Sequence, residues 1–281
     1  MILTKMYIDS LINTAIMEDI NYVDVTTDYL IPKGHQSSAY YIAKDDGILC
    51  GIDVAKRVFE LVGGDVEFQT LIEDGSEVHK GDIIAKMNGS TATLLKGERT
   101  ALNILQHMSG IATATHTCVE LVKGTNAQIT DTRKTLPGLR PIQKYAITVG
   151  GGKNHRYNLS DGAMLKDNHI DAYGGITPAV KALREKIGHM VKIEVEVRNM
   201  EELKEALSAG ADVIMLDNMS CAEMSECVKY VDGKAKLEAS GNVTTENIRA
   251  VAETGVDIIS LGALTHSVKC FDISMRINAV K

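Results

Sequence analysis

Val191-Lys-Ile-Glu-Val-Glu-Val197 is followed by the helix-forming stretch Met200–Ala209 and then by Asp212-Val-Ile-Met-Leu-Asp-Asn218. The first and last of these segments are rich in apolar and β-branched residues, whereas the middle one has the spacing of an amphipathic helix. A strand, a helix and a second strand in this order form a βαβ unit, in which the two strands lie parallel. Because the strands read as near-continuous apolar runs, this stretch predicts a parallel sheet covered by helices.

The same unit recurs through the second half of the chain. Strands are expected at Gln128–Thr132, Ala163–Lys166, Val191–Val197, Asp212–Asn218, Ala235–Gly241 and Asp257–Ala263, and helices at Leu139–Val149, Thr177–Ile187, Met200–Ala209, Cys221–Val231 and Thr245–Thr254. Six strands that alternate with helices predict a TIM-like α/β barrel. A chain of 281 residues has room for such a barrel and for an appended domain.

The N-terminal part of the chain does not show this alternation. Its expected elements are a helix at Leu11–Ile16, strands at Ala39–Ala43 and Ile48–Ile52, a helix at Val54–Leu61, a turn-rich segment at Glu73–Asp82 and a long helix at Ala92–Thr113. We therefore expect an N-terminal α+β sandwich domain over residues 1–109 and a catalytic α/β barrel over residues 110–267. The strand-like tail Val268–Ile277 predicts that residues 268–281 pack back onto the N-terminal domain.

The C-terminal ends of the predicted strands carry a distinctive set of residues. These residues are Arg133, Lys166, Glu196, Asp217, Ser240 and Gly262. The last four are separated by 21, 23 and 22 residues, which is the length of one βα unit. The carboxyl ends of barrel strands meet at one mouth, where barrel enzymes build their active sites. A single polar residue could end a strand as a turn signal, but a set with two cations and two carboxylates favours a shared site.

The region from Asp131 to His169 is a cationic island in an acidic chain. It contains seven Lys or Arg residues against three Asp residues, while the whole chain has a net charge of −7. Such an island favours a small ligand with several negative charges, because nucleic-acid binders usually carry a broad basic face. The chain also lacks Trp and has only 4% aromatic residues, which argues against base stacking. We therefore expect no nucleic-acid partner.

The cysteines and the absence of long apolar runs indicate the compartment. Cys50, Cys118, Cys221, Cys227 and Cys270 are odd in number and contain no Cys-x-x-Cys pair. This pattern indicates reduced thiols rather than disulfides or a zinc site. The sequence shows no signal peptide and no run near the roughly 18 apolar residues of a membrane span. We expect a cytoplasmic protein with no membrane partner.

The cations of the island suit an anionic substrate. The donors expected in one pocket are Arg133, Lys134, His155, Arg156 and Lys166. Arginine can bind a carboxylate or a phosphate through two parallel hydrogen bonds. The arrangement therefore implies a dianionic or polyanionic substrate.

Two acids and two glycine-containing strand ends complete the expected site. Glu196 and Asp217 suit Mg²⁺, which proteins usually hold through one or two carboxylates plus substrate phosphates, or the hydroxyls of a sugar. Ion pairs with Lys166 or Arg133 are the structural alternative for these acids. Ser240-Gly241-Asn242 and Leu261-Gly262-Ala263 follow the last two strands, where barrels bind phosphate.

Several motifs of the chain, taken together and in order, resemble the quinolinate phosphoribosyltransferase family. The motifs are Glu18-Asp-Ile20, Asp24-Val-Thr-Thr27, Gly97-Glu-Arg-Thr-Ala-Leu-Asn103, Ser109-Gly-Ile-Ala112, Asp131-Thr-Arg-Lys-Thr-Leu-Pro-Gly-Leu-Arg140, Lys144-Tyr-Ala146, Gly150-Gly-Gly-Lys-Asn-His-Arg156, Leu165-Lys-Asp-Asn-His169, Glu194-Val-Glu196, Leu216-Asp-Asn218, Ala239-Ser-Gly241, Gly262-Ala-Leu-Thr265 and Asp272-Ile-Ser-Met275. Asn242 stands where this family frequently has a second glycine, and His266 stands where it frequently has lysine. The resemblance covers nearly the whole chain.

The resemblance implies a fold, a reaction and a set of site residues. The family has the type II phosphoribosyltransferase barrel, and its enzymes join quinolinate to phosphoribosyl pyrophosphate with Mg²⁺. They release pyrophosphate and CO₂ and give nicotinate mononucleotide for NAD synthesis. The implied quinolinate ligands are Arg133, His155, Arg156 and Lys166, with Arg99 from the other subunit of a homodimer. The implied catalytic and phosphoribosyl-binding residues are Lys134, Lys166, Glu196 and Asp217, with Ser240, Gly241, Asn242, Gly262 and Ala263 around the 5′-phosphate and Mg²⁺ at Glu196 and Asp217.

Three alternatives stay open at this point. A related phosphoribosyltransferase-like branch associated with molybdate transport shares the fold, but the full set of quinolinate-binding residues disfavours it. A non-catalytic anion-binding barrel would not need Glu196 or Asp217. A carrier domain, suggested by the turn-rich segment Glu73–Asp82, would need a Met-Lys-Met attachment motif, which is missing, because Ala85-Lys-Met87 matches it poorly.

Overall fold

The computed structural model describes residues 2–279, which group into two compact units. Among these residues, the first unit comprises residues 2–116, 136–151 and 267–279, and the second comprises Thr117–Thr135 and Gly152–His266. The chain passes between the units more often than the sequence boundaries at residues 109 and 267 imply. Helix α5 (Arg140–Val149), which we expected in the barrel, groups with the first unit.

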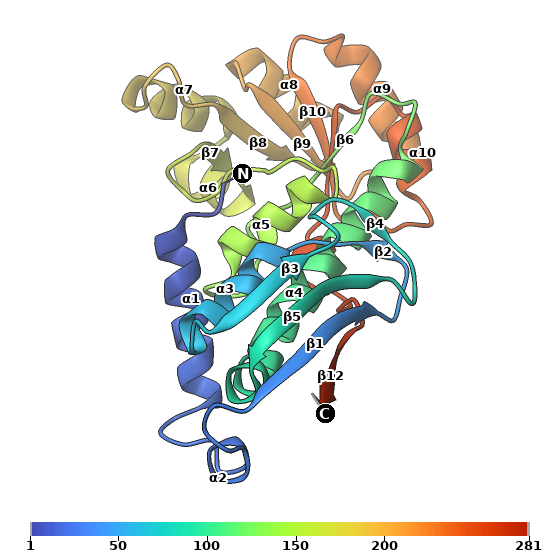
Figure 1. Ribbon diagram of the computed structural model, residues 1–281. Helices are drawn as coiled ribbons and strands as arrows, with labels where there is room; N and C mark the ends of the chain where they lie inside the picture. The colour runs from blue at the N-terminus through green and yellow to red at the C-terminus, as the bar shows by residue number, and fades with distance from the viewer. Residues whose placement is uncertain (1, 280–281) are drawn as a thin grey trace. The chain divides into compact units, whose positions relative to one another are not determined.

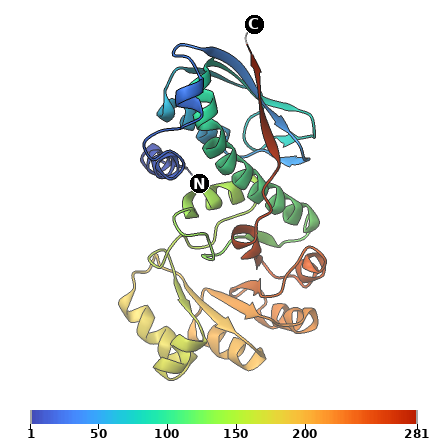
Figure 2. The same ribbon diagram turned by 90° about the horizontal axis from the view of Figure 1, so that it is seen from below.

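The first unit is built on an antiparallel sheet with the strand order β12-β1-β5-β3. Its strands are β1 (Gln36–Ala43), β3 (Val66–Thr70), β5 (Ile83–Ser90) and β12 (Ile273–Ala279), and β2 (Gly47–Ile48) pairs separately with β4 (Glu77–Val78). Strand β12 pairs with β1 from Ser37↔Ala279 to Ala43↔Ile273. The C-terminal strand therefore completes a sheet of the N-terminal unit, along the edge that Figure 2 shows.

Helices and an aromatic cluster fill the core of this unit. The helices are α1 (Lys5–Asp19), α2 (Thr27–Leu30), α3 (Ile52–Val62), α4 (Thr91–Leu121) and α5, of which α4 continues into the second unit. The rings of Tyr41, Phe59 and Phe68 lie 6.0–6.5 Å apart, so one face of the sheet packs on α3 through aromatic contacts. These elements confirm the predicted α+β character of the N-terminal part.

Asp74 sets the start of α3, which the sequence pattern placed incorrectly. We predicted a strand over Ile48–Ile52, but β2 ends at Ile48 and the helix begins at Ile52. Gly51 has φ 102°, a left-handed conformation that glycine adopts without a steric cost. Asp74 Oδ1 accepts the N–H groups of Gly51 and Ile52 at 2.8 and 3.0 Å. A carboxylate distant in sequence thus caps a helix where the local pattern indicated a strand.

Replacing Asp74 by Ala is expected to lower the free energy of unfolding by about 3 kcal/mol, because buried donors would lose their acceptor. These donors include the hydroxyl of Tyr145, which lies 3.0 Å from Asp74 Oδ2. Denaturant unfolding gives the change, and Glu67→Ala, at an exposed position of β3, is the matched control. A change as small as that of the control would contradict this account of the helix start.

The second unit contains a six-stranded parallel sheet with the order β6-β11-β10-β9-β8-β7. The strands are β6 (Gln128–Thr130), β7 (Ala163–Leu165), β8 (Ile193–Val197), β9 (Val213–Asp217), β10 (Lys236–Ser240) and β11 (Ile258–Ser260). The helices are α6 (Asp167–Tyr173), α7 (Ile176–Lys186), α8 (Met200–Ala209), α9 (Cys221–Val231), α10 (Ile248–Glu253) and α11 (Ala263–His266). Every predicted strand of the barrel is present, and the predicted α/β architecture is confirmed. Figure 1 shows α8, α9 and α10 along one face of this sheet.

The strands of this sheet are two-faced rather than uniformly apolar. In β8, Ile193, Val195 and Val197 are fully buried and alternate with Glu194 and Glu196. Successive side chains of a strand point to opposite faces, so the apolar set lies under the helices and the acidic set lies on the other face. The expectation of near-continuous apolar strands was therefore wrong. The face without helices is polar, and it is the face that carries the site.

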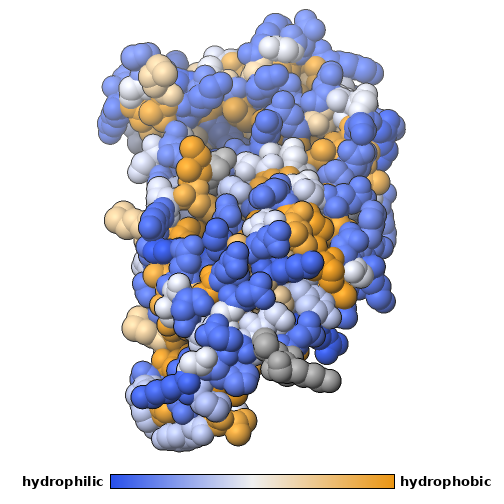
Figure 3. Space-filling view, in the orientation of Figure 1, coloured by the Kyte–Doolittle hydropathy of each residue, from blue (hydrophilic) through white to orange (hydrophobic). Residues whose placement is uncertain are grey.

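Two features of the whole chain bear on its environment. Within residues 2–279, no helix combines the length and the apolar character needed to cross a membrane. Hydrophilic side chains cover most of the face seen in Figure 3, with smaller groups of hydrophobic side chains between them. Three of the cysteines are buried, and all five are free thiols.

Candidate active site

A cavity of about 360 Å³ lies at the carboxyl ends of the parallel strands and belongs wholly to the second unit. Its lining residues are Thr132, Arg133, Lys134, His155, Arg156, Met164, Lys166, Glu196, Met215, Asp217, Asn218, Glu238, Ser240 and Gly241. Five of the six strand-end residues that the sequence indicated are in this list. The strand order explains the convergence, because the carboxyl ends of parallel strands meet at one edge of the sheet.

Arg156 is held as a fixed cation in the wall of the cavity. Its guanidinium donates to the carbonyl of Gly162 at 2.8 Å and to the sulfur of Met164 at 3.5 Å. Burial and then the positive charge of Arg133 lower the pKa of Arg156. The two guanidiniums are close enough to repel each other, and a bound dianion would reduce this repulsion.

Lys166 and Glu196 form an ion pair across the cavity mouth. The Nζ atom of Lys166 lies 2.6 Å from Oε2 of Glu196. The Lys166 side chain is 47% exposed and that of Glu196 is 14% exposed, so the ammonium reaches solvent while the carboxylate is mostly enclosed. The ion pair that we kept as the alternative role for Glu196 is therefore present.

Asp217 is oriented by a chain of two asparagines. Asn242 donates to Asn218 Oδ1 at 2.9 Å, and Asn218 Nδ2 donates to Asp217 Oδ2 at 2.9 Å. Asn218 and Asn242 have φ values of 54° and 53°, in the left-handed region that Asn tolerates better than most residues. A side chain at Gly241 would approach Asn218 Oδ1 to 2.2 Å, so glycine is required there. This geometry explains why Asn can stand at position 242.

Lys134 is tied to the end of the last strand. Its carbonyl accepts the hydroxyl of Thr265 at 2.9 Å, and its side chain packs against Gly262. A Cβ atom at Gly262 would lie 3.1 Å from Lys134 Cδ and 3.1 Å from His266 Nε2. Gly262 and Ala263 are not lining residues of the cavity. Gly262 nevertheless places the β11–α11 connection next to Lys134, which does line it.

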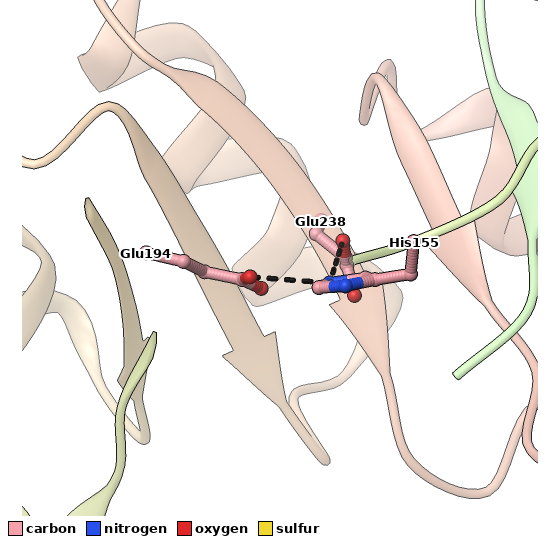
Figure 4. Close-up of side chains that lie close together, drawn as sticks. All are labelled: His155, Glu194 and Glu238. Atoms are coloured by element: carbon pink, nitrogen blue, oxygen red, sulfur yellow. Dashed lines mark ion pairs between the residues drawn. The ribbon is translucent and has the colours of Figure 1, made fainter. Parts of the chain in front are cut away.

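His155, Glu194 and Glu238 form a buried cluster on the polar face of the sheet. Figure 4 shows both carboxyl groups turned toward the imidazole ring. His155 Nε2 lies 3.1 Å from Glu194 Oε2 and 3.5 Å from Glu238 Oε2. The backbone N–H of His155 donates to Asp131 Oδ1 at 2.8 Å, which fixes the position of the loop. Burial opposes the charged ring, but the hydrogen bonds to both carboxyl groups raise the pKa of His155 to about 10.

The sequence analysis did not recognise the roles of Glu194, Glu238 and Asn218 in this site. Glu194 and Glu238 are charged residues inside β8 and β10, two positions before Glu196 and Ser240. Because side chains at i and i+2 of a strand share a face, this spacing could have placed both in the site. Asn218 was recognised as part of a motif but not as the residue that orients Asp217.

Arg99 lies on α4 in the first unit, where its side chain is exposed.

Comparisons with known proteins agree with the motifs of the chain. Profiles described as quinolinate phosphoribosyl transferase, C-terminal domain, and quinolinate phosphoribosyl transferase, N-terminal domain, match residues 111–276 and 24–109. A probable nicotinate-nucleotide pyrophosphorylase (carboxylating) from Bacillus subtilis is 45% identical over 98% of this chain and 95% of its own length. A relative with the same description from Methanocaldococcus jannaschii is 42% identical over 97% of this chain and 98% of its own.

The fold comparison gives the same result. The nicotinate-nucleotide pyrophosphorylase structure from Francisella tularensis superimposes with a TM-score of 0.95 and 37% sequence identity. It covers 99% of this chain and 98% of its own. The similarity therefore extends over both units.

Proposed function

This chain belongs to the quinolinate phosphoribosyltransferase family, and from that membership we propose the roles of its site residues. The protein is a pentosyltransferase that transfers the phosphoribosyl group of phosphoribosyl pyrophosphate to quinolinate in NAD biosynthesis. The reaction releases pyrophosphate and CO₂ and forms nicotinate mononucleotide. The observation in the structure that best supports this reaction is a single cavity with a cationic wall and two acids at its mouth.

The cationic wall suits the pyridine dicarboxylate. Arg133 and Arg156 repel each other in the free protein, and two carboxylates would neutralise both. Lys166, at the same mouth, would meet one carboxylate if its ammonium turned from Glu196. Binding by fixed cations orients the ring nitrogen toward the anomeric carbon and removes water from it. His155 lines the cavity, but its ring is engaged by Glu194 and Glu238, so we assign it to the wall that supports the ring.

The acids suit the phosphoribosyl half. Departure of pyrophosphate leaves positive charge on the ribosyl carbon, and Glu196 and Asp217 can stabilise that charge. Lys134 would hold phosphate oxygens. The backbone at Ser240 and Gly241, continued by Asn242, Gly262 and Ala263, would bind the 5′-phosphate, as barrels do after their final strands.

Magnesium fits this site through Asp217. The Glu196 carboxylate already forms an ion pair with the Lys166 ammonium. The Asp217 carboxylate, at the cavity mouth, instead accepts a hydrogen bond from the neutral amide of Asn218. Oxygen donors from one carboxylate and from substrate phosphates are the usual environment of Mg²⁺. When bound, the ion would neutralise charge on the leaving pyrophosphate. We therefore propose Mg²⁺ at Asp217 and assign Glu196 to the ribose hydroxyls rather than to the metal.

We also propose a homodimer, with the cytoplasm as its compartment. Within residues 2–279, seven of the thirteen large exposed hydrophobic residues lie before residue 31, on or near α1 and α2. A second copy of the chain would cover them, since monomeric proteins rarely expose large apolar patches. The exposed Arg99 would then enter the cavity of the other subunit. The compartment is supported by the five free thiols.

Mixing Arg99→Ala and Lys166→Ala subunits is expected to restore part of the activity that each variant lacks. A mixed dimer has one complete cavity if Arg99 acts across the interface, which limits recovery to about a quarter of the wild-type rate for random exchange. The formation of nicotinate mononucleotide after subunit exchange measures this recovery. An unchanged zero rate, with subunit exchange shown by mass, would argue against a shared site.

Formation of nicotinate mononucleotide from quinolinate, phosphoribosyl pyrophosphate and Mg²⁺ tests the function directly. Nicotinate in place of quinolinate is the control, because a site built for two carboxylates leaves one cation unpaired with it. Product from quinolinate alone is the expected result. Absence of product with both substrates would favour the branch associated with molybdate transport or a non-catalytic barrel.

A further inference from the structure

Asn242 follows the end of β10, at a position where the family frequently has a second glycine. Its φ of 53° lies in the left-handed region, which glycine adopts without a steric cost and which is strained for most other residues. The backbone conformation would therefore be met at least as well by glycine. The amide side chain at this position needs a reason of its own.

The Asn242 amide decides which way the amide of Asn218 faces. A carboxylate only accepts hydrogen bonds, so Asn218 must turn its Nδ2 toward Asp217 Oδ2, as it does at 2.9 Å. The Oδ1 atom of Asn218 then faces away from the acid and accepts from Asn242 Nδ2, at 2.9 Å. If the Asn218 amide were reversed, its oxygen would face the carboxylate and its NH₂ group would face another NH₂ group. Both contacts would then be repulsive, so only one orientation satisfies the three side chains.

The backbone around Asn218 and Asn242 (the asparagine pair) holds both residues in place. The backbone N–H of Asn218 donates to the carbonyl of Ser240 at 3.0 Å. Asn247, which precedes α10, donates through Nδ2 to the carbonyl of Asn242 at 3.0 Å. The Asn218 side chain lies directly over Gly241, where even a Cβ atom would approach its Oδ1 to 2.2 Å. The asparagine pair is therefore a fixed part of this end of the sheet.

This arrangement leaves one carboxylate oxygen of Asp217 for a ligand. Within residues 2–279, the Asp217 side chain accepts a hydrogen bond at Oδ2 and none at Oδ1, and it lines the cavity. One carboxylate oxygen is what Mg²⁺ commonly takes from a protein when substrate phosphates supply further ligands. A carboxylate that is already held in one orientation loses less rotational freedom when it binds the ion.

We propose that Asn242 is a positioning residue for the magnesium site. Through Asn218 it holds the Asp217 carboxylate in the orientation that keeps Oδ2 for the amide and Oδ1 for the ion. The inference rests on the proposed function, in which Mg²⁺ binds at Asp217. It leaves the backbone of residues 240–242 to the 5′-phosphate, because the asparagine pair acts through its side chains. A glycine at position 242 would keep that backbone and lose the hydrogen bond to Asn218.

Asn242→Gly tests this role, because glycine removes the amide and accepts the left-handed backbone. Mn²⁺ replaces Mg²⁺ as the probe, and electron paramagnetic resonance measures its binding to the protein in complex with phosphoribosyl pyrophosphate. The dissociation constant of Mn²⁺ should rise about threefold to tenfold, the size that one neutral hydrogen bond supports. The dissociation constant of quinolinate should change less than about twofold, because the cationic wall is untouched, and the unfolding temperature should stay close to that of the wild type.

Turnover assays separate a positioning role from a general loss of activity. In Asn242→Gly, the Mg²⁺ concentration that gives half the maximal rate should rise by the same factor as the dissociation constant of Mn²⁺. The kcat at saturating Mg²⁺ should stay within about twofold of the wild type, because the bound ion then orients the carboxylate itself. Asn126→Gly, at an exposed position in the turn before β6, is the matched control and should behave as wild type in both measurements.

A double variant shows whether Asn242 acts through Asn218. Asn218→Gly also suits its backbone, with φ 54°, and should weaken Mn²⁺ binding at least as much as Asn242→Gly. Adding Asn242→Gly to Asn218→Gly should then change Mn²⁺ binding less than about twofold, because the residue through which it acts is gone.

The possible failures of the inference and of the proposed function give different results. An Mn²⁺ affinity of Asn242→Gly within about twofold of wild type, or losses that multiply in the double variant, would overturn the role of Asn242. A parallel loss of quinolinate binding and stability would also overturn it, since Asn242 would then support the fold alone. If the wild type bound Mn²⁺ no more tightly than Asp217→Asn, the magnesium site at Asp217 would be wrong and the inference would fall with it.

Discussion

Lys166→Ala is expected to lower kcat/KM for nicotinate mononucleotide formation by about a thousandfold. Hydrogen bonds to charged groups contribute about 1.5–3 kcal/mol each, and the variant loses such a bond to a substrate carboxylate. It also leaves Glu196 without its partner at 2.6 Å, so a negative charge faces the incoming dianion. Together these effects reach about 4 kcal/mol, which corresponds to the stated factor. Steady-state kinetics with quinolinate as the varied substrate gives the change.

A double variant separates the two effects of the lysine. Lys166→Ala combined with Glu196→Gln removes the uncompensated carboxylate, so quinolinate binding should recover about tenfold relative to Lys166→Ala alone. Turnover should stay low, because Glu196 also serves the ribosyl group. Lys181→Ala, at an exposed position on α7, is the control for removing a lysine from this unit. Equal quinolinate affinities of the single and double variants would show that the ion pair does not shape the site.

The strand ends were predictable because their signal is local and periodic. Each βα unit has a strand, a turn and a helix of nearly constant length, so Glu196, Asp217 and Ser240 recur at that spacing. Parallel pairing then places residues at the same position of neighbouring strands side by side, as in the register Ser240↔Asp217. The convergence of these side chains on one cavity follows from the topology, which the sequence pattern predicted.

The remaining parts of the site depend on contacts between residues far apart in the chain. The start of α3 is fixed by Asp74, which the segment around Ile52 cannot reveal. Glu194 faces His155, which lies in a loop 39 residues earlier in the chain. The alternation within β8 did contain a usable signal, but we interpreted the strand as buried on both faces. Helix α5 groups with the first unit because tertiary packing, and not chain order, decides its neighbours.

Arg156→Met is expected to weaken quinolinate binding by about a hundredfold to a thousandfold while changing the free energy of unfolding by less than about 1 kcal/mol. The loss of binding corresponds to two charge-assisted hydrogen bonds of about 1.5–3 kcal/mol each, reduced by their partial exposure. The small effect on stability has a different origin. The variant loses the hydrogen bond to Gly162, but it no longer buries a charge and no longer meets the repulsion from Arg133, the two causes that lower the pKa of Arg156.

Calorimetric titration with quinolinate and denaturant unfolding without it measure the two quantities separately. In the wild type, saturating quinolinate should raise the unfolding temperature, because the ligand binds only the folded protein and relieves the repulsion between the guanidiniums. This increase should disappear in Arg156→Met and persist in Arg276→Met, at an exposed position of β12. A variant that loses stability and binding in parallel would show that Arg156 holds the loop together rather than forming a site for a dianion. Retention of the ligand-induced increase would remove Arg156 from the binding site altogether.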